Sequence, residues 1–116
     1  DMTTPDALRN SYMNGSFFEN FVIMELRKSW LHNGKRASFF FYRDSAFKEV
    51  DLLIKEGTQY FPVEIKMSEN PDVSMIKAFD NIKGGSFTRG PGAVICLAQN
   101  PCYLRPDVVA HSIWDI

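Results

Sequence analysis

Two acidic residues and a lysine near the middle of the chain have side chains suited to divalent-cation and phosphate chemistry. Asp51 is followed by Glu64 and, two residues later, by Lys66. Hard cations such as Mg²⁺ prefer carboxylate oxygens as ligands. A neighbouring lysine can stabilise negative charge that develops on a phosphoryl group. These residues predict a divalent-metal site if the fold brings them together.

A predicted β-hairpin brings them together. Gly57 lies between two apolar runs and can adopt the positive φ that a short hairpin turn requires. Pairing about this glycine makes the numbers of opposite residues sum to roughly 114 or 115, so Asp51 lies level with Val63 or Glu64. Like charges that face each other destabilise a sheet, whereas a bound cation would stabilise this arrangement. The two predicted strands cover residues 50–54 and 61–66.

A helix and a strand are predicted before the hairpin. Apolar residues from Ser16 to Trp30 cover more than half of a helix circumference, which indicates a helix buried against a sheet. Residues 38–43 are apolar on both strand faces, so we expect an interior strand whose aromatic rings lie in the core and do not stack on bases. Pro62 cannot donate to a ladder, so a bulge or a sheet edge is expected there.

A second helix and a fourth strand are predicted after the hairpin. Asn70 and Pro71 are residue types that cap and open a helix, and Gly84 would stop it. Residues 93–98 form an apolar run typical of a buried strand. Residues 100–116 contain short apolar pieces whose order the pattern does not predict.

The elements follow the order α-β-β-β-α-β. We therefore expect one α/β domain over residues 15–116, with a mixed sheet of four strands or slightly more flanked by helices. Residues 1–14 are polar and rich in turn-forming residues, and we interpret them as a linker or lead-in.

Composition excludes several classes of protein. The 116 residues suffice for one core. Thirteen basic and fourteen acidic residues give a net charge of −1, so bulk charge does not predict nucleic-acid binding. Cys96 and Cys102 lack metal-site spacing and are interpreted as reduced thiols. No apolar run is long enough for a membrane helix, and no phosphate-binding loop for nucleotide hydrolysis is present.

The acidic pair, the lysine and the element order together resemble the PD-(D/E)XK nuclease superfamily, which has the restriction-endonuclease-like fold. Asp51 precedes the triplet Glu64-Ile65-Lys66, and both follow a helix that bears Glu19. The α-β-β-β-α-β order is the core of that superfamily. The proline of the superfamily's name is replaced here by Val50.

Four sequence segments narrow the resemblance to one branch. They are GSFFENFVIMEL, FYRD, EVDLLI and PVEIK. They are similar to the domain of unknown function at the C-terminus of many bacterial and archaeal AAA-type ATPases. The similarity covers about residues 15–95, and cleavage is not an established property of this branch. The chain opens without an initiator methionine, which agrees with a fragment of a longer ATPase.

The resemblance implies a role for each site residue. Asp51 and Glu64 resemble the metal-binding acids, and the carbonyl oxygen of Ile65 resembles the backbone ligand. Glu19 resembles the helix acid that completes the metal shell. Lys66 resembles the lysine that orients the attacking water or stabilises charge on the phosphate.

The implied function is hydrolysis of DNA phosphodiester bonds with Mg²⁺ or Mn²⁺, by a cytoplasmic domain attached to an N-terminal ATPase domain of the same chain. Oligomers are compatible with it, and no membrane partner is expected. The alternative is a non-catalytic DNA- or protein-interaction module that regulates the ATPase and retains a relic nuclease site. A purely structural oligomerisation domain is a third interpretation.

The acidic residues also have structural interpretations. Ser16 and Glu19 fit a capping box, in which Glu19 would bond to the Ser16 amide. Glu25, on the same helix, is expected to face solvent or form an ion pair. Glu64 and Lys66 fit a surface ion pair on one sheet face.

Three basic residues are further candidates for contacts with nucleic-acid phosphates. Arg43 and Lys48 lie near a predicted strand end, and Arg89 lies in a glycine-rich stretch where it would be mobile. Solvated surface charge is the alternative for each of them. His32 and His111 are isolated and have no metal-ligand spacing, so we expect surface or core histidines.

Overall fold

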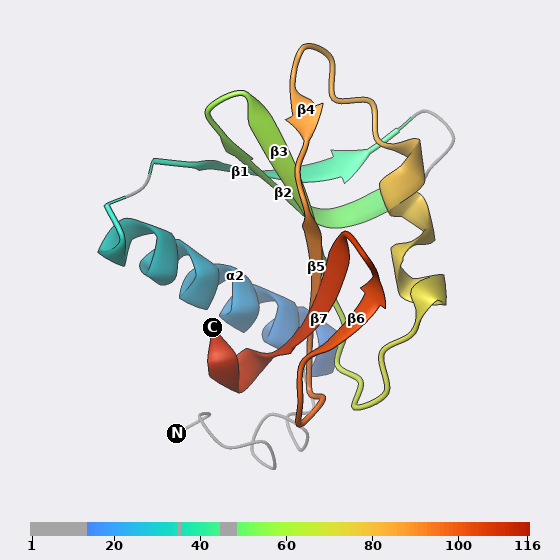
Figure 1. Cartoon of the computed structure of the whole chain (residues 1–116). Helices are drawn as coiled ribbons and strands as arrows, with labels where there is room; N and C mark the ends of the chain where they lie inside the picture. Colours follow the sequence, from blue (N-terminus) through green and yellow to red (C-terminus); the bar gives the residue numbers. More distant parts are fainter. Residues whose placement is uncertain (1–13, 35, 45–48) are drawn as a thin grey trace.

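The computed structural model describes residues 14–34, 36–44 and 49–116, which form a mixed α/β fold around one sheet (Figure 1). Among these residues, no helix is both long and apolar enough to cross a membrane. The helical elements are α2 (Asn14–His32) and the 3-10 helices η1 (Val73–Asn81) and η2 (Ile113–Asp115). The strands are β1 (Ser38–Arg43), β2 (Glu49–Glu56), β3 (Gln59–Ile65), β4 (Thr88–Arg89), β5 (Gly92–Cys96), β6 (Cys102–Arg105) and β7 (Val108–Ser112).

The described residues form a sheet of seven strands in the order β1-β2-β3-β5-β7-β6, with β4 paired to β3. The pairs β1–β2, β2–β3 and β6–β7 are antiparallel, and β5 runs parallel to both β3 and β7. The mixed sheet was predicted, but its size was underestimated. Residues 102–112, which the pattern could not order, form a hairpin that extends the sheet beyond β5.

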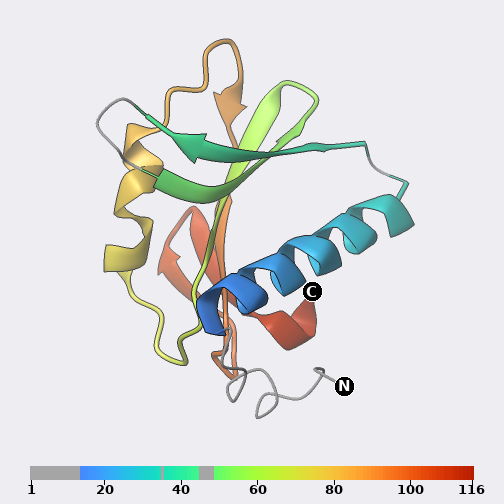
Figure 2. The ribbon, with the colours of Figure 1, turned by 180° about the vertical axis from the view of Figure 1, so that it is seen from behind.

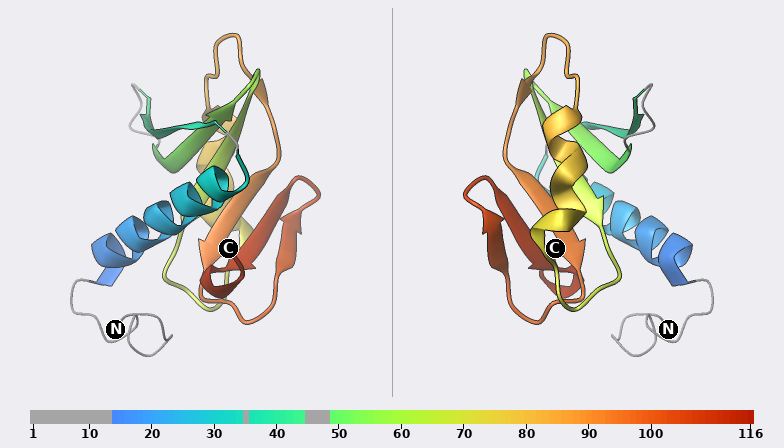
Figure 3. Two further views of the ribbon diagram at one scale, coloured as in Figure 1. Left: turned by 90° about the vertical axis from the view of Figure 1, so that its left-hand side faces the viewer. Right: turned by 90° about the vertical axis from the view of Figure 1, so that its right-hand side faces the viewer.

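Two apolar layers cover the sheet, one on each face. Phe18, Val22 and Leu26 of α2 pack on one face, and Ile76 and Phe79 of η1 pack on the other. Figure 3 shows these two helices on opposite sides of the sheet. The C-terminal turn η2 packs beside α2 (Figure 2). The predicted burial of the first helix and of the strand over residues 93–98, which contains most of β5, is confirmed.

Strand β1 is an edge strand, so its predicted interior position is wrong. Among the described strands it pairs only with β2, and the Phe40 and Phe41 side chains are 45% and 58% exposed. Phe39 and Tyr42 are partly buried, and Phe39 meets the Trp30 ring edge-on with the ring centroids 6.2 Å apart. An apolar strand pattern does not distinguish an interior strand from an edge strand whose rings remain exposed.

Pro62 lies in an interior strand, so the bulge or edge predicted there is also wrong. It pairs with Leu53 without a register shift. On its other side, the partner of β3 changes from β4, which ends at Arg89, to β5, which begins its pairing at Ala93. The missing N–H of the proline falls at this change of partner, where no ladder bond is required.

The segment predicted as the second α-helix is a 3-10 helix that begins later than expected. Asp72, not Asn70, caps it, and its carboxylate accepts a hydrogen bond from the Ser74 N–H at 2.9 Å. Ile76 has non-helical backbone angles in the middle of the segment. Helix α2 also begins earlier than predicted, at Asn14 and not at Ser16.

Candidate functional site

A β-bulge in β2 positions Asp51. Strand β1 pairs Phe40 with Leu53 and Tyr42 with Val50, so one residue of β1 faces both Asp51 and Leu52. Val50 and Leu53 both pack on the η1 side of the sheet, whereas Leu52 packs on the α2 side. Such an extra residue bends the strand and interrupts its ladder. The bulge therefore changes the direction of the Asp51 side chain from the one that it would have in a regular strand.

The strands β2 and β3 separate just beyond the bulge. Their regular pairing runs from Glu56↔Gln59 to Leu52↔Val63 and ends there. The turn residue Gly57 has the predicted positive φ, 62°. If this register continued by one step, Asp51 would lie opposite Glu64. This is one of the two pairings that the sequence predicted for Asp51.

Two carboxylates bridge the gap between the separating strands. Asp51 Oδ2 accepts a hydrogen bond from the Ile65 N–H at 2.8 Å, and Glu64 Oε1 accepts one from the Asp51 N–H at 3.3 Å. Lys66 Nζ lies 3.4 Å from Glu64 Oε2. In a strand the N–H and C=O of one residue point the same way, so the Ile65 carbonyl faces this gap too. We call Asp51, Glu64 and Lys66 the acid fork.

Burial makes the acid fork costly to ionise. Glu64 is only 8% exposed, and burial, followed by the charge of Asp51, raises its pKa to about 7. Burial also raises the pKa of Asp51, although the hydrogen bond from the Ile65 N–H opposes this shift. Lys66 lowers both pKa values only in part, because its side chain is 44% exposed and therefore screened by water.

A third acid, Glu19, lies near the fork on α2. Burial raises its pKa first, and the charge of Asp51 raises it further. The described residues nevertheless contain no group of three or more His, Cys, Asp or Glu side chains arranged to hold a metal ion. The structure thus brings Asp51, Glu64 and Lys66 into contact and places Glu19 within electrostatic reach, but not in a preformed ligand shell.

Glu49 is a contributor that the sequence reasoning missed. Its charge raises the pKa of both Asp51 and Glu19. The alternation of the segment Glu49-Val50-Asp51 was the available signal, because side chains two residues apart in a strand share a face. Glu25, by contrast, forms the expected ion pair, with Lys28 at 3.0 Å.

Two of the three predicted phosphate contacts, Arg43 and Arg89, lie outside the acid fork. Arg43 Nη2 is 2.6 Å from Glu49 Oε1. Arg89 donates to the Phe79 carbonyl oxygen at 3.1 Å and forms ion pairs with two aspartates, so its guanidinium is held in place. Lys48 lies outside the described residues.

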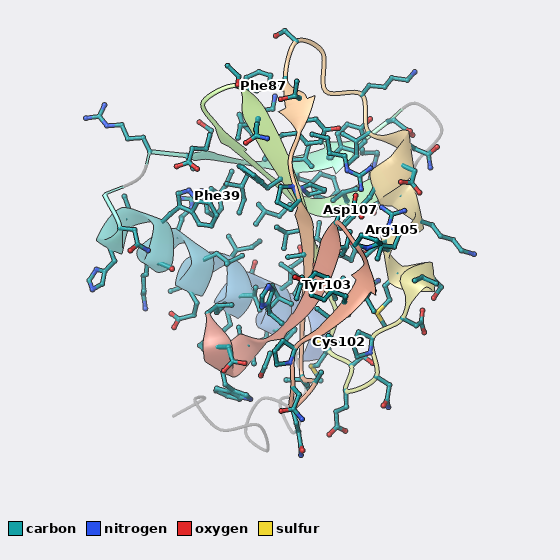
Figure 4. All side chains as sticks on the ribbon, in the orientation of Figure 1. Phe39, Phe87, Cys102, Tyr103, Arg105 and Asp107 are labelled. Atoms are coloured by element: carbon teal, nitrogen blue, oxygen red, sulfur yellow. The ribbon has the colours of Figure 1, made fainter. Side chains whose placement is uncertain are left out.

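Arg89 belongs to a second charged cluster, which we call the arginine–aspartate network. Its members are Asp80, Arg89, Arg105 and Asp107. Figure 4 shows Arg105 and Asp107 close together, near η1. The network ties η1 to the strands β4 and β6, so its role is structural.

One of three comparisons with known proteins identifies the family of the chain. A family model described as "Domain of unknown function (DUF4143)" matches residues 14–115. No curated protein matches the chain, and no solved structure does. The family match spans α2, the whole sheet and η2, so the acid fork lies within it. The chain therefore belongs to the DUF4143 family of domains of unknown function.

Proposed function

We propose that the acid fork binds a divalent cation, Mg²⁺ or Mn²⁺, and that the domain hydrolyses phosphodiester bonds in DNA. The observation that carries the proposal is the pair of partly buried carboxylates that meet where β2 and β3 separate, with one lysine beside them. Two such acids resist ionising together, and a bound cation would reverse this by favouring both charged forms.

The donor set fits Mg²⁺ better than a cation that needs a complete protein cage. Asp51, Glu64 and the Ile65 carbonyl would supply oxygen ligands, and Glu19 is the nearby acid that would add to them. Mg²⁺ is commonly held by one or two carboxylates, and waters and substrate phosphates complete its shell. A site without three preformed protein acids is compatible with this mode of binding.

The residues of the acid fork would have different roles in hydrolysis. A bound cation would supply polarisation of the phosphoryl oxygen and a more acidic water. The Ile65 N–H fixes the Asp51 carboxylate by a 2.8 Å hydrogen bond, so this ligand is already oriented. Lys66, 3.4 Å from Glu64, would position the attacking water or stabilise the charge that develops on the phosphate.

The resemblance to the PD-(D/E)XK superfamily supports the same assignment. It rests on the order of Glu19, Asp51, Glu64 and Lys66 along the chain and on the hairpin that carries the last three. By the same resemblance, we propose that the domain is attached to an AAA-type ATPase.

Calorimetric titration with Mn²⁺ tests the metal site without a choice of substrate. We expect saturable binding by the wild type, a large loss in Glu64→Gln, and no change in the control Asp80→Asn, whose carboxylate belongs to the arginine–aspartate network. Equal binding by the wild type and Glu64→Gln at millimolar Mn²⁺ would contradict the proposal.

Cleavage is tested separately with Lys66→Ala. This variant should retain Mn²⁺ binding and lose about 10²- to 10³-fold in the rate of Mg²⁺-dependent DNA cleavage, the usual loss when one charge-stabilising donor is removed. An unchanged rate would contradict the role given to Lys66.

A second candidate function is a non-catalytic DNA- or protein-interaction module that regulates the ATPase. The observation that favours it is structural: both carboxylates already accept backbone hydrogen bonds that hold β2 and β3 together. This function predicts that Asp51→Asn destabilises the fold and that the wild type cleaves no DNA even with Mn²⁺ bound.

A further inference from the structure

Two hollows meet at the Ser38 end of the edge strand β1. One, of about 410 Å³, lies toward the β2–β3 turn and is lined by Lys55, Gly57 and Phe87 among others. The other, of about 560 Å³, lies toward α2 and is lined by Arg27 and Phe39 among others. They share Arg36, Ala37, Ser38 and Phe40 in their linings, so they adjoin each other around this end of β1, and we call the two hollows together the edge groove. Its key side chains are Arg27, Arg36, Phe39, Phe40, Lys55 and Phe87.

Cations of the edge groove lie over its aromatic rings. Lys55 Nζ lies 4.8 Å from the centroid of the Phe40 ring and 4.6 Å from that of Phe87. Arg27 Cζ lies 5.4 Å from the centroid of the Phe39 ring. Figure 4 shows Phe39 between β1 and α2 and Phe87 near the β2–β3 turn, and each of these rings lines one of the two hollows.

The cations of the groove differ from the other arginines of the domain. Arg43, Arg89 and Arg105 each form an ion pair with a carboxylate. Within the described part of the chain, none of the groove cations (Arg27, Arg36 and Lys55) has a carboxylate partner, and neither hollow is lined by an acidic residue. The groove is thus a local positive surface on a chain whose net charge is −1.

We infer that the edge groove binds single-stranded nucleic acid. Unpaired cations attract phosphates, and exposed rings stack on unpaired bases, which is how proteins bind single strands without sequence preference. The 45% exposed Phe40 ring is open to such stacking. A duplex keeps its bases stacked on one another and would engage only the cations.

The inference goes beyond the proposed nuclease activity and does not depend on it. Lys55 is four residues from Asp51 on β2, about 13 Å at ~3.3 Å per residue. A strand bound in the groove would therefore lie within a few nucleotides of the acid fork. Because the groove contains none of the fork residues, its binding is measurable with metal removed.

Fluorescence anisotropy with a labelled oligonucleotide of about fifteen thymidines, in EDTA, tests the inference. We expect the single strand to bind more tightly than a duplex of equal length. Phe40→Ala should weaken binding about tenfold at one salt concentration and leave the salt dependence unchanged. Lys55→Gln should lower the slope of log K against log [NaCl] by about 0.7, the loss of one phosphate contact.

Two matched controls lie away from the groove. Tyr103→Ala removes a 73% exposed ring on β6, the opposite edge of the sheet, and Lys77→Gln removes an exposed cation on η1. Both should bind like the wild type. Phe40→Leu keeps an apolar side chain but removes the ring, so a loss of binding in this variant, with unchanged thermal unfolding, excludes misfolding as the cause.

Three results would overturn the inference. They are no binding of the oligonucleotide at about 50 mM NaCl, equal weakening by Phe40→Ala and Tyr103→Ala, and tighter binding of a polyglutamate peptide than of the oligonucleotide. The last would assign the groove to an acidic protein segment. None of them bears on Mn²⁺ binding by the acid fork, so the two proposals fail independently.

Discussion

The arginine–aspartate network and the acid fork are two charged clusters on one sheet, and their charges are balanced differently. In the network, Arg105 Nη1 lies 2.9 Å from Asp80, and Arg89 contacts both Asp80 and Asp107. Two cations thus face two anions. In the fork, Lys66 is the only cation with an ion pair to either carboxylate among the described residues.

The pKa values of the carboxyl groups in the two clusters are shifted in opposite directions. Hydrogen bonds from Arg105 and Arg89 hold the pKa of Asp80 below its ordinary value. Burial and the charge of Asp51 raise the pKa of Glu64 to about 7. Ionised aspartates therefore stabilise the network, whereas ionising the fork opposes folding. The ion pairs of the network stabilise its charged form, and the cation that we propose for the fork would stabilise the charged form there.

The largest expected effect is a fall in stability with rising pH in the metal-free protein. Between the ordinary value of 4.5 and about 7, folded Glu64 binds its proton more tightly than the unfolded chain does. The free energy of unfolding should therefore fall by about 3 kcal/mol over this range, at 1.36 kcal/mol per pKa unit. Asp51 and Glu19 contribute with the same sign. Urea unfolding at a series of pH values in EDTA measures this fall.

The network gives a control within the same pH series. Asp80 of the network has a lowered pKa, as has the helix-capping Asp72 outside it, so the contribution of these two carboxylates is lost only as the pH falls below about 3.8. Stability should thus be greatest near pH 4 to 5, and Glu64→Gln should flatten the fall above it. A stability that is constant from pH 5 to 8 in the wild type would contradict the assignment.

Arg89→Ala should destabilise the domain by about 2 kcal/mol near neutral pH, because it removes two ion pairs and a hydrogen bond to a backbone carbonyl. Chemical denaturation measures the change. Lys77→Ala, at an exposed position on η1, is the matched control and should stay within about 0.5 kcal/mol of the wild type. Equal effects of the two substitutions would show that the network does not stabilise the fold.

Replacing one carboxylate of each cluster by its isosteric amide tests the difference between the acid fork and the arginine–aspartate network. At pH 8 in EDTA, Glu64→Gln should stabilise the protein by about 1 kcal/mol, because it removes a buried negative charge. Asp80→Asn should destabilise it, by less, since Asp80 is largely exposed and its ion pairs are screened. Differential scanning calorimetry gives both signs, and shifts in the same direction would remove the contrast between the clusters.

The smallest expected effect belongs to Lys66→Met. Removing this cation should raise the pKa of Glu64 above about 7, since Lys66 now opposes the effects of burial and of Asp51. The change should be modest because the ammonium is 44% exposed. Titration of the Glu64 side-chain carboxyl carbon by NMR measures the change, and a pKa that stays the same or falls would contradict the role given to Lys66.

Local features of the sequence predicted the hairpin and the pairing of its acids. Gly57 determines the turn, and the strand alternation then determines which residues face each other. Both are properties of a few neighbouring residues, so the sequence suffices for them.

Features that depend on distant partners were not predictable in this way. The bulge at Asp51 arises from pairing with β1 and was not predicted, whereas a bulge or a sheet edge was expected at Pro62, where neither occurs. Strand β7 forms by parallel pairing with β5, which no local pattern specifies. The edge groove gathers Arg27, Lys55 and Phe87 from three separate segments, so no spacing in the sequence indicates it.

The extra residue in β2 also determines how the domain would respond to a change in chain length. Val50 and Leu53 pack on the same face although they are three positions apart in the sequence. In a regular strand, neighbouring side chains on one face are two positions apart. Removing Asp51 would restore that spacing and leave both core side chains in place. A deletion elsewhere in β2 would instead move its remaining apolar side chains to the wrong face. The sheet can therefore lose this one residue and keep its core, whereas the proposed site cannot.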